Sequence, residues 1–345
     1  MLTDSHFHFD GELSLNESSE YFGNFMKKHS IDKAAVLAYC AWLEENDMPH
    51  SNFKCLWLKK TMAPKIFAYM SLSHNFEKRL SAQDYLRQLE QGLEMGFDGI
   101  KFLEGKPDLR KRLGFSLADS VFDLVYEKLE KLNFPITMHV ADPEYFWREP
   151  DAYCYYGDGS FLTKEQLYAE VDEILCRFPA LNLTLAHFYF LSEDLDCAAK
   201  FLDKHPSVNF DITPGWEMFS DFSKNPLHAR EFFKVYKNRI LWGSDVTNTK
   251  INDSYNNEVY LLLTKALGDG DDFVVREKVF SAIGPDEETL HFIKYKNMQR
   301  ILGDSPRPIN CAATRKYISQ FMLENPDLSP EYKKELDMIA KDFEQ

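Results

Sequence analysis

The sequence lacks the features that mark membrane and secreted proteins. No stretch of about 18 apolar residues occurs, which argues against a membrane-spanning helix. The N-terminus, Met-Leu-Thr-Asp-Ser-His, has no cationic start followed by an apolar run, so a secretory signal is not expected. These absences predict a cytoplasmic protein that does not associate with membranes.

Basic charge is also scarce. The chain has 40 Lys and Arg against 55 Asp and Glu, a formal net charge of −15. With this balance, and without any basic block that resembles a DNA-binding arm, nucleic acid is not an expected partner. None of the six cysteines stands in a CxxC pair, which favours reduced thiols over a zinc ribbon or a disulfide framework.

What the sequence does have is apolar residues in short, regularly spaced runs. Hydrophobic residues make up 44% of the chain and aromatics 14%, enough to fill a substantial core. Eight runs have the length and β-rich composition of buried parallel strands. They are Leu2 to His8, Ala34 to Tyr39, Ile66 to Leu72, Gly99 to Leu103, Pro135 to Val140, Leu181 to His187, Val208 to Ile212 and Ile240 to Ser244.

Amphipathic segments of helical length separate these runs. They include Ala82 to Met95, Leu117 to Leu132, and Thr163 to Phe178, in which Thr163 and Gln166 fit a capping box. Alternating strands and helices predict an α/β fold, either a barrel or a doubly wound sheet, and periodicity alone does not separate the two. We expect one large domain over residues 1–303 and a helical extension, residues 304–345, packed on it.

His6 and His8 stand two residues apart on the first predicted strand. Side chains at i and i+2 point to the same face of a strand, so two imidazoles could bind one cation. An HxH pair alone is a weak signal, because histidine is also a common buried side chain.

Three further polar residues fall at or just after the ends of later strands. His139 ends the fifth strand, His187 the sixth, and Asp245 follows the eighth in Trp-Gly-Ser-Asp. In a (β/α)8 barrel these ends converge on the active-site face. Asp211, at the end of the seventh strand, is a candidate to orient a ligand histidine through its other ring nitrogen.

This order of residues, an HxH pair followed by His139, His187 and the Asp of Trp-Gly-Ser-Asp, resembles the amidohydrolase superfamily. The branch it resembles is the amidohydrolase-2 group, which includes aminocarboxymuconate-semialdehyde decarboxylase-like proteins. The resemblance spans about residues 2–302. It implies a distorted (β/α)8 TIM barrel that binds a divalent metal ion, usually zinc and sometimes manganese.

The resemblance also implies roles for individual residues. His6, His8 and His139 would be metal ligands, and Asp245 a ligand or a close partner of the metal-bound water. His187 would be a catalytic imidazole or, in two-metal members, a ligand of the second ion.

Lys101 lies on the fourth strand, where two-metal relatives carry a carboxylated lysine. We favour a single Zn²⁺, with Lys101 as a substrate-binding or supporting cation; Mn²⁺, or a second metal held by carboxylated Lys101, is the alternative.

A metal held by neutral imidazoles lowers the pKa of its bound water to about 7. Asp245 could accept the proton of that water, and His187 could polarise the substrate carbonyl or stabilise an oxyanion.

The long segment after the fifth strand, residues 141–161, is rich in aromatic side chains. Tyr145, Trp147 and Arg148 are candidates for substrate binding in a lid over the metal, because loops after barrel strands lie on the catalytic face. The alternative is a contact in a homodimer, since aromatics and Arg are enriched at interfaces.

A second segment is rich in basic residues. Such a segment is more typical of a solvated face than of a contact with an acidic substrate. It contains Lys106, Arg110, Lys111 and Arg112.

Three classes of function follow. The first is a metal-dependent hydrolase that cleaves a C–N or C–O bond in an amide, lactone or ester of a small substrate. This substrate would be acidic if the basic run contacts it. The second is a non-oxidative decarboxylase of a small carboxylic acid, and the third a non-catalytic metal-binding protein. The presence of acid–base candidates beside the ligand set argues against the third.

Overall fold

The computed structural model describes residues 1–9, 13–38, 50–152, 154–249 and 252–344. Tyr39, at the end of the second predicted strand, and Tyr153, within the aromatic segment 141–161, therefore lie outside the described residues. In the described part of the chain, no helix is both long enough and apolar enough to cross a membrane.

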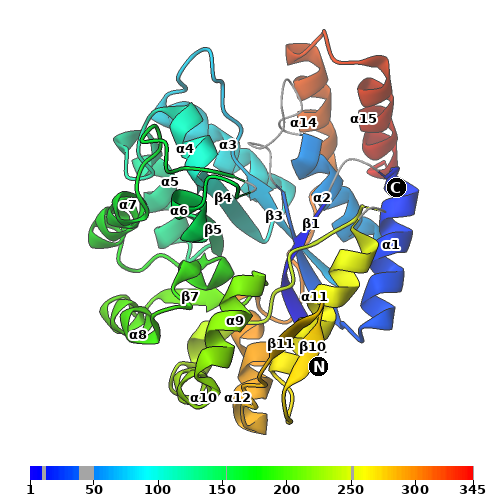
Figure 1. Ribbon diagram of the computed structural model, residues 1–345. Coiled ribbons are helices and arrows are strands. Elements are labelled where there is room, and N and C mark those ends of the chain that lie inside the picture. The colour runs from blue at the N-terminus through cyan, green and yellow to red at the C-terminus, as the bar shows by residue number, and fades with distance from the viewer. Residues whose placement is uncertain (10–12, 39–49, 153, 250–251, 345) are drawn as a thin grey trace.

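A parallel sheet forms the centre of the molecule (Figure 1). Its strands are buried along most of their length, as expected for a parallel sheet that is covered on both faces. They are β1 (Thr3–His8), β2 (Lys33–Leu37), β3 (Ile66–Ser71), β4 (Gly99–Gly105), β5 (Ile136–Val140), β6 (Leu183–Leu185), β7 (Val208–Asp211), β8 (Ile240–Leu241) and β9 (Val246–Thr247).

The sheet closes into a barrel through one interrupted stretch of chain, residues 240–247. The strand order is β8-β7-β6-β5-β4-β3-β2-β1-β9, so β8 pairs with β7 and β9 pairs with β1. Between them, the Ser5 N–H donates to the Trp242 carbonyl (2.9 Å) and the Asp245 N–H to the His6 carbonyl (2.8 Å). The predicted eighth strand is thus present but broken, and the fold is a distorted TIM barrel.

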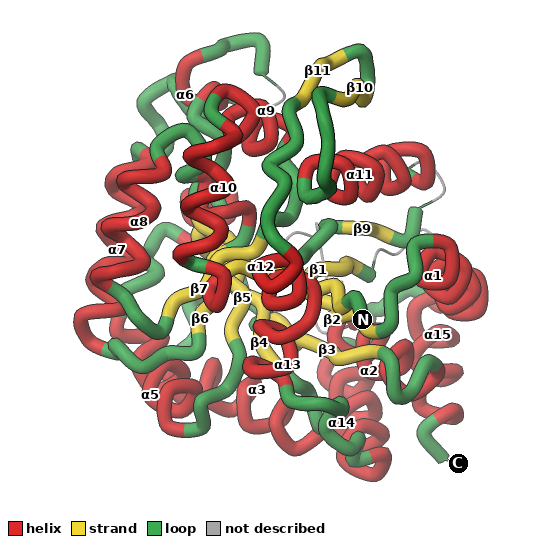
Figure 2. Tube along the Cα trace, turned by 90° about the horizontal axis from the view of Figure 1, so that it is seen from below, coloured by secondary structure: helices red, strands yellow, loops and turns green. Residues whose placement is uncertain are grey.

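Helices surround the barrel (Figure 2). Those between β1 and β5 are α1 (Leu15–Lys28), α2 (His50–Thr61), α3 (Ala82–Met95), α4 (Pro107–Leu113) and α5 (Asp123–Lys131). Those between β5 and β8 are α6 (Tyr145–Arg148), α7 (Lys164–Arg177), α8 (Leu195–Lys204), α9 (Trp216–Lys224) and α10 (Pro226–Val235). After β9 come α11 (Asp253–Ala266), the hairpin β10 (Phe273–Val275) and β11 (Lys278–Phe280), α12 (Glu287–His291) and α13 (Asn297–Leu302).

The C-terminal extension consists of α14 (Cys311–Glu324) and α15 (Pro330–Asp342). Helix α14 packs on α3 and α15 on α2, at the side of the barrel seen in Figure 1. The Trp57 indole N–H donates to the Asp342 carboxylate (2.7 Å), and Ile318 and Leu336 are buried in the same apolar core as the barrel strands. The extension therefore shares the core of the barrel.

Local signals in the sequence explain where several helices begin. The Thr163 side chain accepts from the Gln166 N–H, while the Gln166 side chain accepts from the Thr163 N–H, so the capping box predicted for α7 is present. Ser14 and Ser81 form the same arrangement at α1 and α3. These caps satisfy backbone donors that the first turn of a helix leaves without partners.

We expect Thr163→Ala to lower the free energy of unfolding by about 1 kcal/mol, because the cap of α7 is lost. Urea denaturation followed by circular dichroism measures this, with Thr163→Ser as the matched control that keeps the hydroxyl. Equal stability of the alanine and serine variants would contradict the role assigned to the cap.

Candidate metal centre

Strand β1 directs His6 and His8 to one point inside the barrel mouth. Their Nε2 atoms are 3.0 Å apart, and both side chains are largely buried. The Nδ1 atom of His6 lies 2.9 Å from Asp211 Oδ2, and the Nδ1 atom of His8 lies 3.0 Å from the Leu37 carbonyl oxygen. Each ring is therefore fixed from behind by an oxygen acceptor.

These hydrogen bonds determine which ring nitrogens carry protons. A carbonyl or carboxylate oxygen accepts, so Nδ1 carries the proton in both rings and each neutral ring has its lone pair on Nε2. Burial, followed by the charge of Lys101, lowers the pKa of His6 to about 4, which keeps this ring neutral near pH 7. Two lone pairs that converge at 3.0 Å repel each other unless a cation lies beside them, which can be a metal ion or the Lys101 ammonium group. The donor set thus fits a metal ion.

Asp245 adds a carboxylate to the two imidazoles. It follows β8 with a φ of 57°, and its Oδ1 lies 3.2 Å from His8 Nε2 and 3.6 Å from His6 Nε2. Burial acts to raise the pKa of Asp245, but the nearby rings of His8, His6 and His187 lower it well below its usual range. One ligand atom from each of these three residues lies within 4.8 Å of the other two, a spacing that could hold one divalent metal ion.

Lys101 reaches the same point from β4. Its side chain is 1% exposed, and its Nζ lies 3.0 Å from His6 Nε2. Burial lowers the pKa of Lys101 to about 8, although the charges of Asp211, Asp245 and Glu104 oppose that shift. Lys101 therefore lies inside the site, and its substrate-binding or supporting role stays a prediction.

Asp211 connects the His6 side of the site with His187. Its Oδ2 accepts from His6, and its Oδ1 accepts from the His187 backbone N–H (2.8 Å) and from the Thr213 hydroxyl (2.6 Å). Burial acts to raise the pKa of Asp211, but the proximity of the His6 ring and its hydrogen bond lower it below the usual range. A buried carboxylate that orients a ligand histidine is the role predicted for Asp211.

His139 is buried at the end of β5, outside the close group of His6, His8 and Asp245. Its Nε2 donates to the Ala141 carbonyl oxygen (2.9 Å) and lies 3.3 Å from Asp142 Oδ1, and its ring centroid is 4.7 Å from that of His187. The lone pair of the neutral ring is consequently on Nδ1. The role of His139 as a ligand stays a prediction.

Sequence reasoning did not single out Asp142, which connects His139 with the aromatic segment. Its Oδ2 accepts from Lys106 Nζ and from the Tyr156 hydroxyl, each at 2.7 Å. The signal that could have found it is its position, three residues after the strand-end His139. Thr213 was also missed, although it lies two residues after Asp211, the same spacing as in the HxH pair.

The predicted substrate-binding residues of the aromatic segment lie at different depths. The Trp147 ring packs against Tyr156 with its N–H donating to the Leu162 carbonyl (3.0 Å), whereas Tyr145 is 36% exposed. The Arg148 side chain is 68% exposed and is paired with Glu144 at 3.2 Å. Trp147 therefore stabilises the segment from within, and Tyr145 and Arg148 face solvent.

Two residues of the basic run, Lys106 and Arg110, are largely buried, whereas Lys111 and Arg112 are exposed, as predicted for a solvated face. Lys106 pairs with Asp142 and Arg110 with Glu170, while Arg112 lies 3.8 Å from the ring centroid of Phe76. These cations have partners within the protein, which weakens the case that they bind an acidic substrate.

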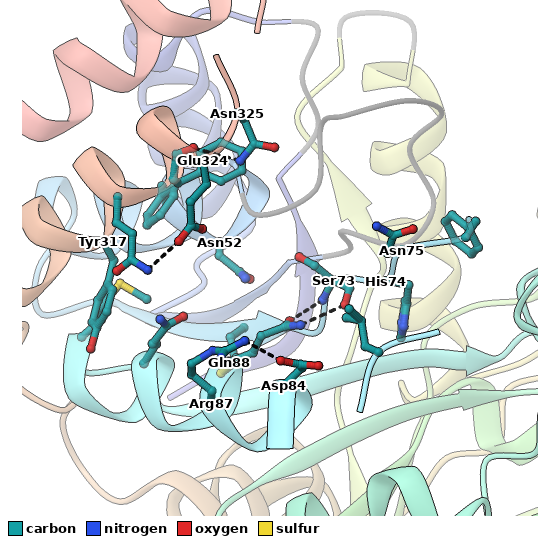
Figure 3. Close-up of a pocket in the computed structure, with 18 of the residues that line it drawn as sticks. Asn52, Ser73, His74, Asn75, Asp84, Arg87, Gln88, Tyr317, Glu324 and Asn325 are labelled. Carbon is teal, nitrogen blue, oxygen red and sulfur yellow. Dashed lines mark hydrogen bonds and ion pairs between the residues drawn. The ribbon is translucent and has the colours of Figure 1, made fainter. Parts of the chain in front are cut away.

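A hollow of about 800 Å³ lies between α2, α3, α14 and the segment after β3 (Figure 3). The histidines of the metal centre and Asp245 do not line it. Several of its polar side chains are bound to the protein itself: Gln88 pairs with both backbone groups of Ser73, and Asn52 with those of Ser71. These side chains brace the segment after β3.

The fold and the histidine–aspartate group define a TIM barrel that can hold a metal ion at the mouth. The family model described as Amidohydrolase matches residues 79–303, well over half of the 345 residues. The chain belongs to this family and is an enzyme of the amidohydrolase superfamily. No curated protein matches the sequence at a significant level.

Solved structures share the fold at low sequence identity. An uncharacterised TIM-barrel protein from Bordetella bronchiseptica has a TM-score of 0.56 and 11% identity, covering 87% of this chain and 98% of that one. A 4-oxalomesaconate hydratase from Rhodopseudomonas palustris has a TM-score of 0.54 and 13% identity, covering 88% and 95%. A 5-carboxyvanillate decarboxylase from Sphingomonas paucimobilis has a TM-score of 0.52 and 10% identity, covering 87% and 98%.

We expect His6→Ala and His8→Ala each to weaken Zn²⁺ binding by more than about 100-fold, since each variant removes a ligand from a site with few donors. Competition against a chromophoric chelator measures the affinity. The control is His228→Ala, because His228 is a half-exposed histidine on α10, paired with Asp196 at 3.4 Å. Unchanged affinity in the His6 and His8 variants would place the metal elsewhere.

Proposed function

We propose that the protein is a metal-dependent hydrolase that cleaves a C–N or C–O bond in an amide, lactone or ester of a small molecule. The observation that carries this proposal is the convergence of the His6 and His8 Nε2 lone pairs beside the ionised carboxylate of Asp245. Neutral nitrogen donors with one carboxylate suit a catalytic divalent metal such as Zn²⁺, and Mn²⁺ is the alternative.

The site would hold the metal on His6 and His8, with Asp245 and His139 as further candidate ligands. Such an ion supplies a Lewis acid and makes hydroxide available near pH 7. We favour one ion, because the described residues gather one group of three His, Cys, Asp or Glu side chains with metal-ligand spacing.

The residues around this point supply proton transfer and charge. Asp245 is ionised and its side chain is 38% exposed, so it can accept a proton and return it to a leaving group. Lys101 contributes a buried amine whose pKa of about 8 lets it stabilise developing negative charge near neutral pH. His187 presents a second imidazole, 5.6 Å from the His6 ring between centroids.

Asp245→Asn is expected to lower kcat by about 100-fold or more, because the amide cannot accept the proton that the carboxylate takes. The measurement uses zinc-loaded protein with panels of lactones, amides, esters and aromatic acids, and follows proton release and carbon dioxide separately. Circular dichroism checks that the variant is folded.

Near-normal turnover by Asp245→Asn would contradict its role in proton transfer. Release of carbon dioxide without hydrolysis of any panel member would replace the hydrolase proposal by the second candidate, a non-oxidative decarboxylase. A 5-carboxyvanillate decarboxylase is among the proteins that share the fold, which supports including aromatic acids in the panel.

A further inference from the structure

Thr213, just after β7, bridges Asp211 and His187. It is fully buried, and its Oγ1 lies 2.6 Å from Asp211 Oδ1 and 3.0 Å from His187 Nδ1. The His187 backbone N–H also reaches this hydroxyl oxygen, at 3.1 Å. One buried hydroxyl is thus shared by a carboxylate, an imidazole and a backbone amide.

Only one placement of protons is consistent with the hydrogen bonds that join Asp211, Thr213 and His187. Asp211 Oδ1 receives N–H groups from the backbone of His187 (2.8 Å) and Thr213 (3.2 Å), and such groups only donate, so this oxygen is an acceptor. The single proton of the Thr213 hydroxyl therefore points to Asp211 at 2.6 Å. Towards His187 the hydroxyl oxygen can only accept, so the proton of the imidazole must be on Nδ1.

The hydrogen bonds to Asp211 and Thr213 also hold the backbone around His187. Residues 187–190 all have φ between 49° and 56°, a left-handed conformation that costs about 1–2 kcal/mol per residue for side chains other than glycine. The His187 N–H bonds to Asp211 and Thr213, together with the buried rings of Phe188 and Tyr189, hold this turn in place. Such strain is typical of functional sites, where the surroundings fix an unusual geometry.

We propose that Asp211 and Thr213 are positioning residues that hold His187 in the Nδ1–H form, so that its Nε2 presents a lone pair at the barrel mouth. In the described part of the structure, no hydrogen bond is made to that Nε2. His187 then acts by accepting a proton or by binding a cation, and a neutral ring in this form cannot donate a hydrogen bond from Nε2 to a substrate carbonyl. This tautomer revises the expectation that His187 polarises the substrate carbonyl. Only the predicted effect on turnover rests on the proposed function.

The test observes the tautomer directly. The full chain is labelled with ¹⁵N-histidine, loaded with one equivalent of Zn²⁺, and studied by long-range ¹H–¹⁵N correlation spectra at pH 7.5. The chain has 10 histidines, and His187→Gln identifies the resonances of His187 by their loss. We expect the Nδ1–H pattern for His187 in the wild type and in Thr213→Ser, which keeps the hydroxyl.

Thr213→Val removes the hydroxyl at nearly constant volume, so we expect loss of the pure Nδ1–H pattern and a kcat lower by about 10- to 100-fold, the usual effect of removing such a support. Serine should restore both readouts. Zinc affinity should change by less than about threefold, because Asp211 Oδ2 still holds His6.

An Nε2–H pattern for His187 in the wild type would overturn the proposal, as would a valine variant with an unchanged tautomer. The spectra need no substrate. If no tested compound is hydrolysed but the Nδ1–H pattern is found, the proposed function fails and this inference stands.

Discussion

The buried carboxylate of Asp211 is the interaction on which the site depends. A charge without solvent is costly unless it is paired and hydrogen-bonded, and both oxygens of Asp211 are used: Oδ2 by His6, and Oδ1 by Thr213 and the backbone of His187. One side chain on β7 therefore fixes the His6 ring directly, and it holds the His187 backbone directly and the His187 ring through Thr213. Their orientation is built into the fold before any ligand binds.

The interrupted closing strand has an equally specific consequence. In a continuous strand over residues 240–247, the alternation of side chains between the two faces would set the direction of Asp245. Instead, Asp245 itself has a left-handed backbone conformation between β8 and β9, and its carboxylate lies 3.2 Å from His8. The chain passes very close to β1 and β7 here, since a Cβ on Gly243 would lie 2.7 Å from Thr213 Cγ2 and 3.0 Å from Ser5 Oγ. Any larger residue in place of this glycine would therefore displace the Thr213 and Ser5 side chains.

The short apolar runs predicted eight buried parallel strands, and the resemblance carried by the strand-end polar residues implied the TIM barrel and the grouping of His6, His8 and Asp245. They could not predict the details that depend on backbone breaks. The sixth strand was predicted over residues 181–187 but is limited to Leu183–Leu185, because a left-handed turn begins at His187. Apolar pattern carries no sign of such a turn.

Contacts between side chains that are far apart along the chain could not be predicted from the sequence for the same reason. Thr213 is an ordinary polar residue in the chain, and only the barrel brings it to His187, 26 positions away. The exposure of Arg148 follows from the short helix α6, which turns its side chain towards Glu144 and solvent. Long loops after barrel strands predict where a lid can form, but not which side chains point inward.

The central claim is that His6 Nε2 and His8 Nε2 bind one divalent ion at the barrel mouth. Anomalous diffraction at the zinc edge, from crystals of the zinc-loaded protein, tests it most directly. The account predicts one peak about 2.0–2.1 Å from each Nε2, with Asp245 beside it. A peak elsewhere, or no peak at these nitrogens with the Lys101 amine still bonded to His6, would contradict it.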